Sequence, residues 1–144
     1  MKSRSEEQFG AKIGEIARIW RIRLDERLRP LGLSQTRWMA ILHLSKSPDG
    51  LPQTELATRM SISHASLSPQ IDRLVEDGWV ERRGRENDRR CKTIHMTEQA
   101  KTLSREIKQT AAKLRSELLE GLSDEDIHHC ERVLTHILLR AQSL

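Results

Sequence analysis

Apolar residues recur at three- and four-residue intervals along most of the chain, which is the spacing typical of amphipathic helices. The first series lies between about Glu6 and Arg29 and stops at Pro30 and Gly32, two residue types that end helices. Its apolar positions are Phe9, Ile13, Ile16, Trp20, Leu24 and Leu28. The pattern predicts a long N-terminal helix with one apolar face.

Three shorter helices are predicted in the middle of the chain. The first begins after the N-cap residue Ser34, the second spans Gln53 to Met60, and the third spans about Ser63 to Asp77 with Gly78 as its C′ residue. The expected inward positions are Trp38, Ile41, Leu42, Leu44, Leu56, Ala57, Met60, Leu67, Ile71, Leu74 and Val75. Two short helices joined by a tight turn form the helix-turn-helix pattern.

After Gly78 the periodicity changes from helical to alternating, which is typical of β-strands. Residues 79–83 and 91–96 are predicted as two strands, and the polar segment 84–90 joins them as a long loop. This arrangement is a β-hairpin that projects from the helices, or wing. Its basic residues are Arg82, Arg83, Arg85, Arg89, Arg90 and Lys92.

Two further helices close the chain. Thr97 is expected to cap the first, which Gly121 ends, and Ser123 opens the last with acidic residues in its first turn. Their apolar stripes are Leu103, Ile107, Ala111, Leu114 and Leu118, then Ile127, Cys130, Leu134, Ile137, Leu138 and Ala141. Without a repeat or a linker, residues 1–144 are predicted to form one mainly α-helical domain with a small β-hairpin wing.

Composition narrows the class of protein. The chain has 144 residues, 36% hydrophobic and 32% charged, which is too apolar for a disordered tail. It has no run of about 18 apolar residues, and no apolar segment follows the charges of its first nine residues, so membrane insertion and secretion are not expected. Cytoplasm is the expected compartment, with Cys91 and Cys130 as reduced thiols.

The positive charge is concentrated in two windows. Residues 1–37 hold nine basic and five acidic side chains, residues 38–78 hold three and five, and residues 79–96 hold six and three. The formal net charge is +4. An anionic partner that meets the wing is therefore expected.

The helix that begins near Ser63 carries polar, uncharged side chains in its first two turns. Such side chains hydrogen-bond to base edges when the N-terminal part of a helix enters the major groove. Two alternative interpretations stay open. Serines at a helix start are equally expected as caps, and the basic wing is also expected as a solvated turn with no partner. Wing arginines bind phosphates or a narrow minor groove. The candidate DNA-binding residues are Ser63, His64, Ser66, Ser68, Gln70, Arg73, Arg83, Arg85, Asp88, Arg89, Arg90 and Lys92.

From about Ile13 to its end the chain resembles the MarR family of winged-helix regulators, and most closely the SlyA-like branch. The matching segments are residues 18–21, 31–33, 35–38, 74–80, 87–90 and 96–97. The resemblance implies that Asp88 pairs with Arg90 and holds it for insertion into the minor groove, while Arg89 and Lys92 grip the backbone. It also implies a homodimer, with residues 1–33 and 98–144 as dimerisation helices and residues 34–97 as the winged helix-turn-helix.

Pro69 departs from the family pattern, because it lies where several relatives carry a basic or polar side chain that reaches DNA. Proline inside a helix costs about 3 kcal/mol or more. If Ser66 were the N-cap, the proline would fall in the first turn and cost little. His64, Ser66, Ser68 and Gln70 are the expected readers.

The resemblance also implies release by a small aromatic or phenolic anion. Arg21 and Trp38 match positions that line the ligand cavity in SlyA-like relatives. Two alternatives stand beside this interpretation. Trp38 is also expected as a core residue, and Arg21 as the partner of Asp25 at the i+4 position.

Cys91 at the base of the wing is a candidate redox site, because Arg89, Arg90 and Lys92 would favour its thiolate. Cys130 reads as a small hydrophobe in a helical stripe. The six histidines and two cysteines form no convincing metal-ligand set, and no cofactor is expected.

The leading hypothesis is a homodimeric transcriptional regulator, a repressor, that binds a pseudo-palindromic operator with half-sites about 34–36 Å apart. Its partners are double-stranded DNA, a second copy of the chain and the small anion. The alternative is a winged-helix protein-interaction module with weak or non-specific DNA binding, favoured by Pro69 and the acidic balance of residues 38–78. An enzyme is not expected, because nucleophile–base sets and glycine-rich phosphate loops are missing from the sequence.

Overall fold

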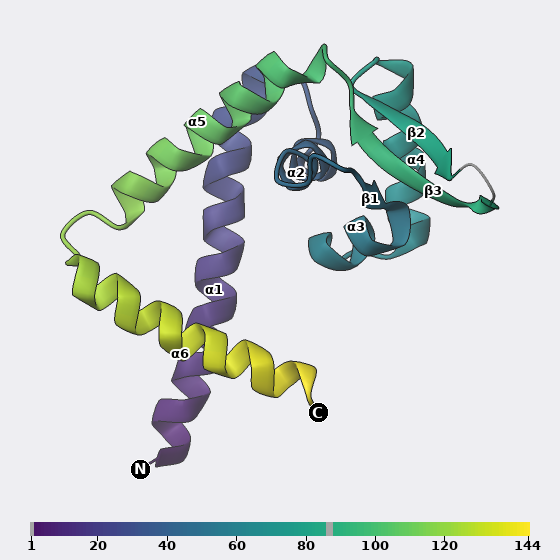
Figure 1. Cartoon of the computed structure of the whole chain (residues 1–144). Coiled ribbons are helices and arrows are strands. Elements are labelled where there is room, and N and C mark those ends of the chain that lie inside the picture. The colour runs from purple at the N-terminus through teal and green to yellow at the C-terminus, as the bar shows by residue number, and fades with distance from the viewer. Residues whose placement is uncertain (1, 86–87) are drawn as a thin grey trace. The chain divides into compact units, whose positions relative to one another are not determined.

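The computed structural model describes the backbone of residues 2–85 and 88–144, and the side chains of residues 4–84 and 92–144. Most of the chain is helical, and a three-stranded antiparallel sheet lies among the helices (Figure 1). The elements are α1 (Lys2–Leu28), η1 (Arg29–Leu31), α2 (Gln35–Leu44), β1 (Leu51–Pro52), α3 (Gln53–Met60), α4 (His64–Glu76), β2 (Val80–Arg85), β3 (Asp88–Met96), α5 (Ala100–Leu118) and α6 (Asp124–Gln142). The predicted mainly helical fold with a β-hairpin is confirmed.

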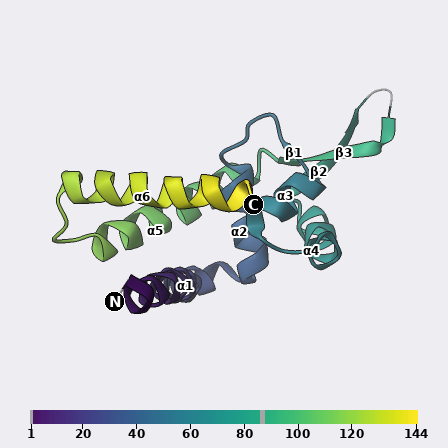
Figure 2. The same cartoon turned by 90° about the horizontal axis from the view of Figure 1, so that it is seen from below.

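The chain divides after Ala112 into two compact units, residues 1–112 and residues 113–144. In the first unit, α3 and α4 lie beside the sheet (Figure 2). Its core consists of large apolar side chains with almost no exposed surface, namely Leu28, Trp38, Ile41, Leu56, Leu67, Ile71, Leu74, Val80, Ile94 and Ile107. None of the helices among the described residues is long and apolar enough to cross a membrane.

The sheet has the strand order β1-β3-β2. Val80 pairs with Met96 and Arg83 with Thr93, so the wing hairpin is in the predicted place, with strands longer than expected. Leu51 pairs with Ile94 on the other side of β3. The sequence did not predict β1, because two residues ending in proline are too short to show an alternating pattern.

Serine caps fix three of the helix starts. Ser34, Ser63 and Ser123 each accept a hydrogen bond from the backbone N–H three residues later, as the sequence predicts. At Ser123 the Asp126 carboxylate accepts the return bond from the Ser123 N–H, which completes a capping box. The local sequence therefore determines where α2, α4 and α6 begin.

The predicted cap at Thr97 is wrong. Its hydroxyl donates to the Gly78 carbonyl at 2.6 Å, and α5 begins only at Ala100. Gly78 has φ +80°, so it supplies the left-handed residue that ends α4. Thr97 thus ties the end of the wing to this turn instead of capping the next helix. Two predicted inward side chains also differ, since Leu42 is half-buried and Val75 is 37% exposed.

Pro69 lies inside α4, because the helix begins at His64 with Ser63 as its N-cap. The alternative in which Ser66 is the N-cap of this helix is therefore wrong. Proline has no N–H, so the Ala65 carbonyl lacks the bond that the residue four positions later would donate. We expect Pro69→Ala to raise the free energy of unfolding by about 1–3 kcal/mol, measured by urea denaturation. Equal or lower stability would contradict the assignment of Pro69 to the helix interior.

His43 in the last turn of α2 has a pKa below its ordinary value of 6.5, chiefly because burial disfavours the charged ring and also because Lys46 and Arg59 repel it. Protonation therefore favours the unfolded chain. The stability associated with a neutral His43 is present above about pH 6.5 and is lost as the pH falls. Urea denaturation at about pH 7 and pH 5 should show a smaller acid-induced loss for His43→Gln than for the parent. An identical loss in both proteins would contradict this role.

Candidate nucleic-acid interface

The two serines at the start of α4 bind each other. The Ser63 hydroxyl accepts the Ser66 N–H at 3.0 Å and donates to the Ser66 hydroxyl at 2.8 Å. Both side chains are exposed. The capping interpretation of Ser63 is confirmed, and the exposed Ser66 hydroxyl still has acceptor capacity toward a partner.

Two other predicted readers contact neighbouring helices. The exposed His64 lies with its Nε2 3.2 Å from the Gln53 Nε2 at the start of α3. Gln70 is half-buried, and its Oε1 accepts a 3.5 Å bond from the Ser34 hydroxyl at the start of α2. Gln70 thus faces the preceding helices, whereas His64 and Ser66 stay at the surface.

The exposed side of α4 carries residues that sequence reasoning did not select. Leu67, Ile71 and Leu74 are buried, while Ala65 and Pro69 are exposed. Four-residue spacing places the exposed pair on one face of the helix, turned away from the buried residues. The four-residue spacing is visible in the sequence, but neither residue has a hydrogen-bonding side chain, so neither was among the predicted readers.

An ion pair joins α4 to the wing. Arg82 of β2 donates from Nη2 to the Asp72 Oδ1 at 2.6 Å. Arg83, the next residue, pairs with Glu81 on its own strand. The pair neutralises a carboxylate on the surface of α4 and ties this helix to the hairpin.

Two other predicted DNA-binding residues are exposed cations. Lys92 is exposed on β3, and Arg73 is exposed on α4. The other predicted wing residues, Arg85, Asp88, Arg89, Arg90 and the redox candidate Cys91, lie outside the side chains that the structure describes. Their roles stay predictions.

The two predicted ligand residues occupy different environments. Trp38 is 1% exposed, and its indole N–H donates to the Asp25 Oδ1 at 2.8 Å. Arg21 is exposed on α1, where its Nε donates to the Ala17 carbonyl at 3.4 Å. Asp25 thus binds Trp38, and the predicted core role of this tryptophan is confirmed.

A cavity of about 520 Å³ lies in the first unit at the base of the wing. It is lined by residues from the end of α2, the turn after it, both wing strands and the start of α5, namely Leu44, Ser45, Ser47, Pro48, Glu81, Arg83, Met96, Thr97, Glu98 and Lys101. Its two cations each pair with a carboxylate in the lining, Arg83 with Glu81 and Lys101 with Glu98. The cavity is polar and close to charge-neutral, and neither Arg21 nor Trp38 lines it.

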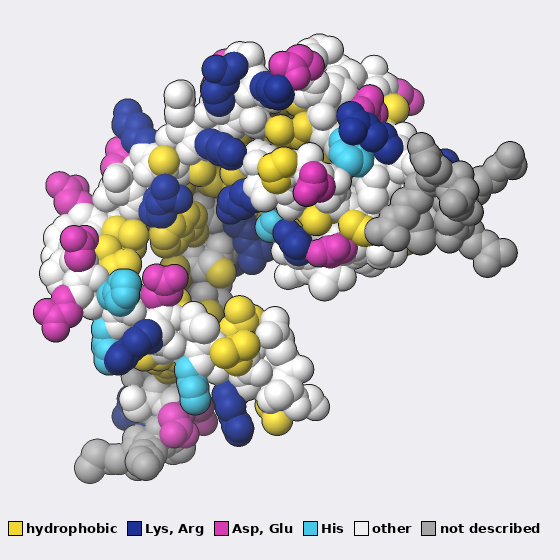
Figure 3. Space-filling view, viewed as in Figure 1, with side chains coloured by type: hydrophobic (Ala, Val, Ile, Leu, Met, Phe, Trp, Pro, Cys, Tyr) yellow, Lys and Arg dark blue, Asp and Glu magenta, His cyan; other side chains and the backbone are white. Residues whose placement is uncertain are grey.

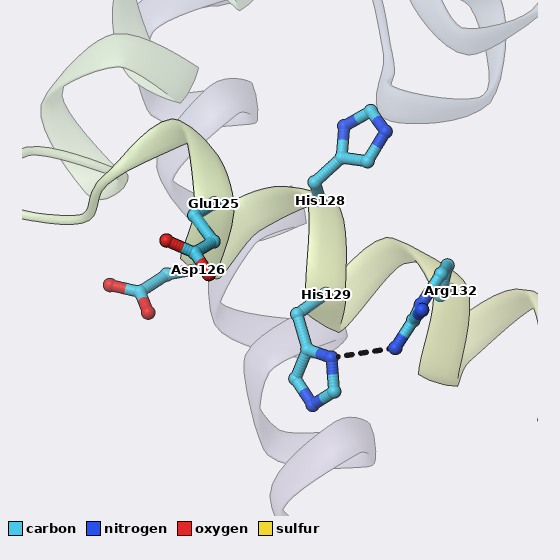
Figure 4. A pocket seen from close by; sticks show the side chains of 5 residues that line it. All are labelled: Glu125, Asp126, His128, His129 and Arg132. Carbon is cyan, nitrogen blue, oxygen red and sulfur yellow. Dashed lines mark hydrogen bonds between the residues drawn. The ribbon is translucent and has the colours of Figure 1, made fainter.

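A second hollow, about 460 Å³, lies along α6 in the other unit. Figure 4 shows the imidazoles of His128 and His129 pointing in different directions, and the Arg132 Nη2 lies 3.0 Å from the His129 Nδ1. Within the described part of the chain, His, Cys, Asp and Glu form no group able to hold a metal ion. The hollow thus offers separate charges and not a converging site.

Comparisons with known proteins point to one class. A family model described as the MarR family matches residues 31–90. The chain is 36% identical to the transcriptional regulator PA3341, with a TM-score of 0.90 over 94% of this chain and 99% of that one. A MarR regulator from Methanosarcina mazei Go1 matches with 23% identity and a TM-score of 0.83, over 95% and 98% of the two chains.

Two further structures share the fold. A MarR-type regulator from Listeria monocytogenes, solved with a 26mer DNA, matches with 19% identity and a TM-score of 0.82, over 90% of this chain and 86% of that one. The regulator SlyA matches with 21% identity and a TM-score of 0.83, over 94% of each chain. These values do not single out the SlyA-like branch, which stays a prediction.

Proposed function

Since the chain belongs to the MarR family of transcriptional regulators, whose members are not enzymes, we propose that it represses transcription by binding a specific double-stranded DNA sequence as a homodimer. The observation that carries this proposal is the junction of α4 and the wing. The exposed first turns of α4 suit a major groove, and the Asp72–Arg82 pair ties the hairpin, which is basic in sequence, to the C-terminal half of the same helix.

The charge distribution supports insertion of α4 by its N-terminal half. The first two turns hold no acidic side chain, whereas Asp72 and Glu76 follow in the C-terminal half. Asp72 is paired with Arg82, so Glu76 is the carboxylate that phosphates would repel, and the basic wing would bind the backbone beside the site. The predicted readers His64, Ser66 and Ser68 lie in the favoured half.

Exposed apolar side chains on the long helices support a homodimer. On α1, Phe9 is 47% and Ile16 is 49% exposed, and α6 has no buried residue at all. Hydrophobic side chains reach the surface over α6 in Figure 3. Monomers rarely leave such stripes uncovered, so a second copy of the chain is the proposed partner of residues 1–33 and 98–144. Residues 34–97 then form the DNA-binding part.

A dimer with two-fold symmetry presents two copies of α4. It therefore requires a pseudo-palindrome whose half-sites lie about 34–36 Å apart, one helical turn of DNA. A ligand that binds better to a form with a different spacing of these helices would release the operator. A small aromatic or phenolic anion is the proposed effector.

Arg21 is the proposed charge partner of that anion. We expect Arg21→Ala to lower the affinity for salicylate by about tenfold in calorimetry, because an ion pair to a carboxylate is lost. Lys101→Ala, in the cavity at the base of the wing, is the matched control and should leave the affinity unchanged. If Lys101→Ala lowers the affinity for salicylate and Arg21→Ala leaves it unchanged, the effector binds in that cavity and not at Arg21.

Selection of bound duplexes from a random DNA pool at two salt concentrations tests the proposed function. We expect enrichment of a pseudo-palindrome with one-turn half-site spacing, and an affinity that falls with salt with a slope of about −0.9 for each phosphate contacted. Binding that is weak, indifferent to sequence and sensitive to salt would contradict the proposal. It would favour a winged-helix module that binds another protein.

A further inference from the structure

The surface that α4 turns away from the core is apolar at its N-terminal half. Ala65 and Pro69 are both exposed and lie one helical turn apart, opposite the buried Leu67, Ile71 and Leu74. Together they present a methyl group and a pyrrolidine ring. The centre of this face therefore suits an apolar contact and not an ion pair.

Pro69 has no evident structural reason to be there. It lies inside α4, where proline destabilises the helix, and its ring is exposed, so it contributes little to the core. A residue that destabilises its helix and is exposed within a site that otherwise fits DNA is a candidate for contact with a partner.

The residues beside Ala65 and Pro69 are polar, and the nearest carboxylate, Asp72, forms an ion pair. Ser66 lies on one side of the Ala65–Pro69 face and Ser68 lies on the other side. Ser66 is exposed, whereas Ser68 is half-buried. Asp72, one turn after Ser68, is bound by Arg82 at 2.6 Å. The pair is thus a small apolar patch bordered by hydroxyl groups and free of unpaired negative charge.

We propose that Ala65 and Pro69 form a contact site for the C5 methyl groups of thymines in the major groove. This inference rests on the proposed DNA-binding function and specifies which bases the site selects. Thymine alone presents a methyl group in the major groove of unmodified DNA, and small apolar side chains are its matching contacts. Guanine, cytosine and adenine present no methyl group in the major groove, so the same patch would make no matching apolar contact with them.

The test begins with the duplex selected by the purified full-length protein. Each thymine of one half-site is replaced in turn by deoxyuridine, which removes only the methyl group. We expect one or two neighbouring positions to lose about 3–5-fold in affinity, the value of one buried methyl group. The other positions should change less than about 1.5-fold, since they bury no methyl group against the protein.

Pro69→Ala assigns the effect to this patch. The variant should fold, and at the sensitive position nearest Pro69 its affinity ratio between thymine and uracil should fall toward one. Val75→Ala, which trims an exposed apolar side chain near the other end of α4, is the matched control and should keep the parental ratio.

Two results would overturn the inference while leaving the proposed function intact. One is an operator in which every deoxyuridine is tolerated. The other is a thymine-to-uracil ratio that Pro69→Ala leaves unchanged, which would assign the effect to DNA shape. If no duplex is enriched at all, the proposed function itself fails, and the inference fails with it.

Discussion

Replacement of Leu134 and Leu138 together by aspartate is expected to abolish operator binding while the protomer stays folded. These side chains are 50% and 56% exposed on α6, so the single chain loses little when they become charged. In the proposed dimer they are covered by the second copy, where an unpaired carboxylate is strongly unfavourable. A monomer engages one half-site only, so affinity should fall by roughly 10³-fold, toward that of non-specific DNA.

Sedimentation and circular dichroism separate the two parts of this prediction. The variant should sediment as a monomer with the parental helix content. His136→Asp is the matched control, because position 136 lies on the other side of α6 from Leu134 and is already exposed and polar. A double variant that stays dimeric and binds the operator would exclude α6 from the dimer interface.

Trp38→Ala is expected to lower the free energy of unfolding by about 3–5 kcal/mol, the usual result of removing a large buried aromatic ring. Trp38 is 1% exposed, and its N–H satisfies the Asp25 carboxylate. The substitution opens a void among α2 and its neighbours and leaves the half-buried Asp25 without this donor. Urea denaturation at one fixed protein concentration measures the effect.

Trp38→Phe distinguishes packing from hydrogen bonding. It keeps most of the ring volume but removes the indole N–H, so the loss should be smaller, about 1–3 kcal/mol. A loss below about 1 kcal/mol for Trp38→Ala would show that the side chain is not a core residue. Its predicted place in a ligand cavity would then regain support.

Local signals in the sequence predicted most of the fold. Serine caps and left-handed glycines act within a few residues, so the starts of α2, α4 and α6 and the end of α4 were accessible from the sequence. Tertiary pairing was not. The strand β1 depends on the pairing of Leu51 with Ile94, which is distant in sequence. The Thr97 hydroxyl does not cap α5 because it donates to the Gly78 carbonyl instead.

The candidate site was predicted in place but not in detail. Residue type led the sequence analysis to the start of α4 and to the wing, two elements that the structure contains, whereas the direction of each side chain depends on packing. Gln70 illustrates this limit, since its polar side chain lies against Ser34 of another helix. Ala65 and Pro69 illustrate the converse, because these two apolar side chains face outward although neither was among the predicted contact residues.

We propose that two protomers bind one operator, each placing α4 in one half-site. Native mass spectrometry and affinity measurements on the selected duplex test it most directly, with a second duplex carrying about five extra base pairs between the half-sites, half a helical turn. We expect two protomers per duplex and loss of specific affinity on insertion. One bound protomer, or an affinity indifferent to the insertion, would contradict it.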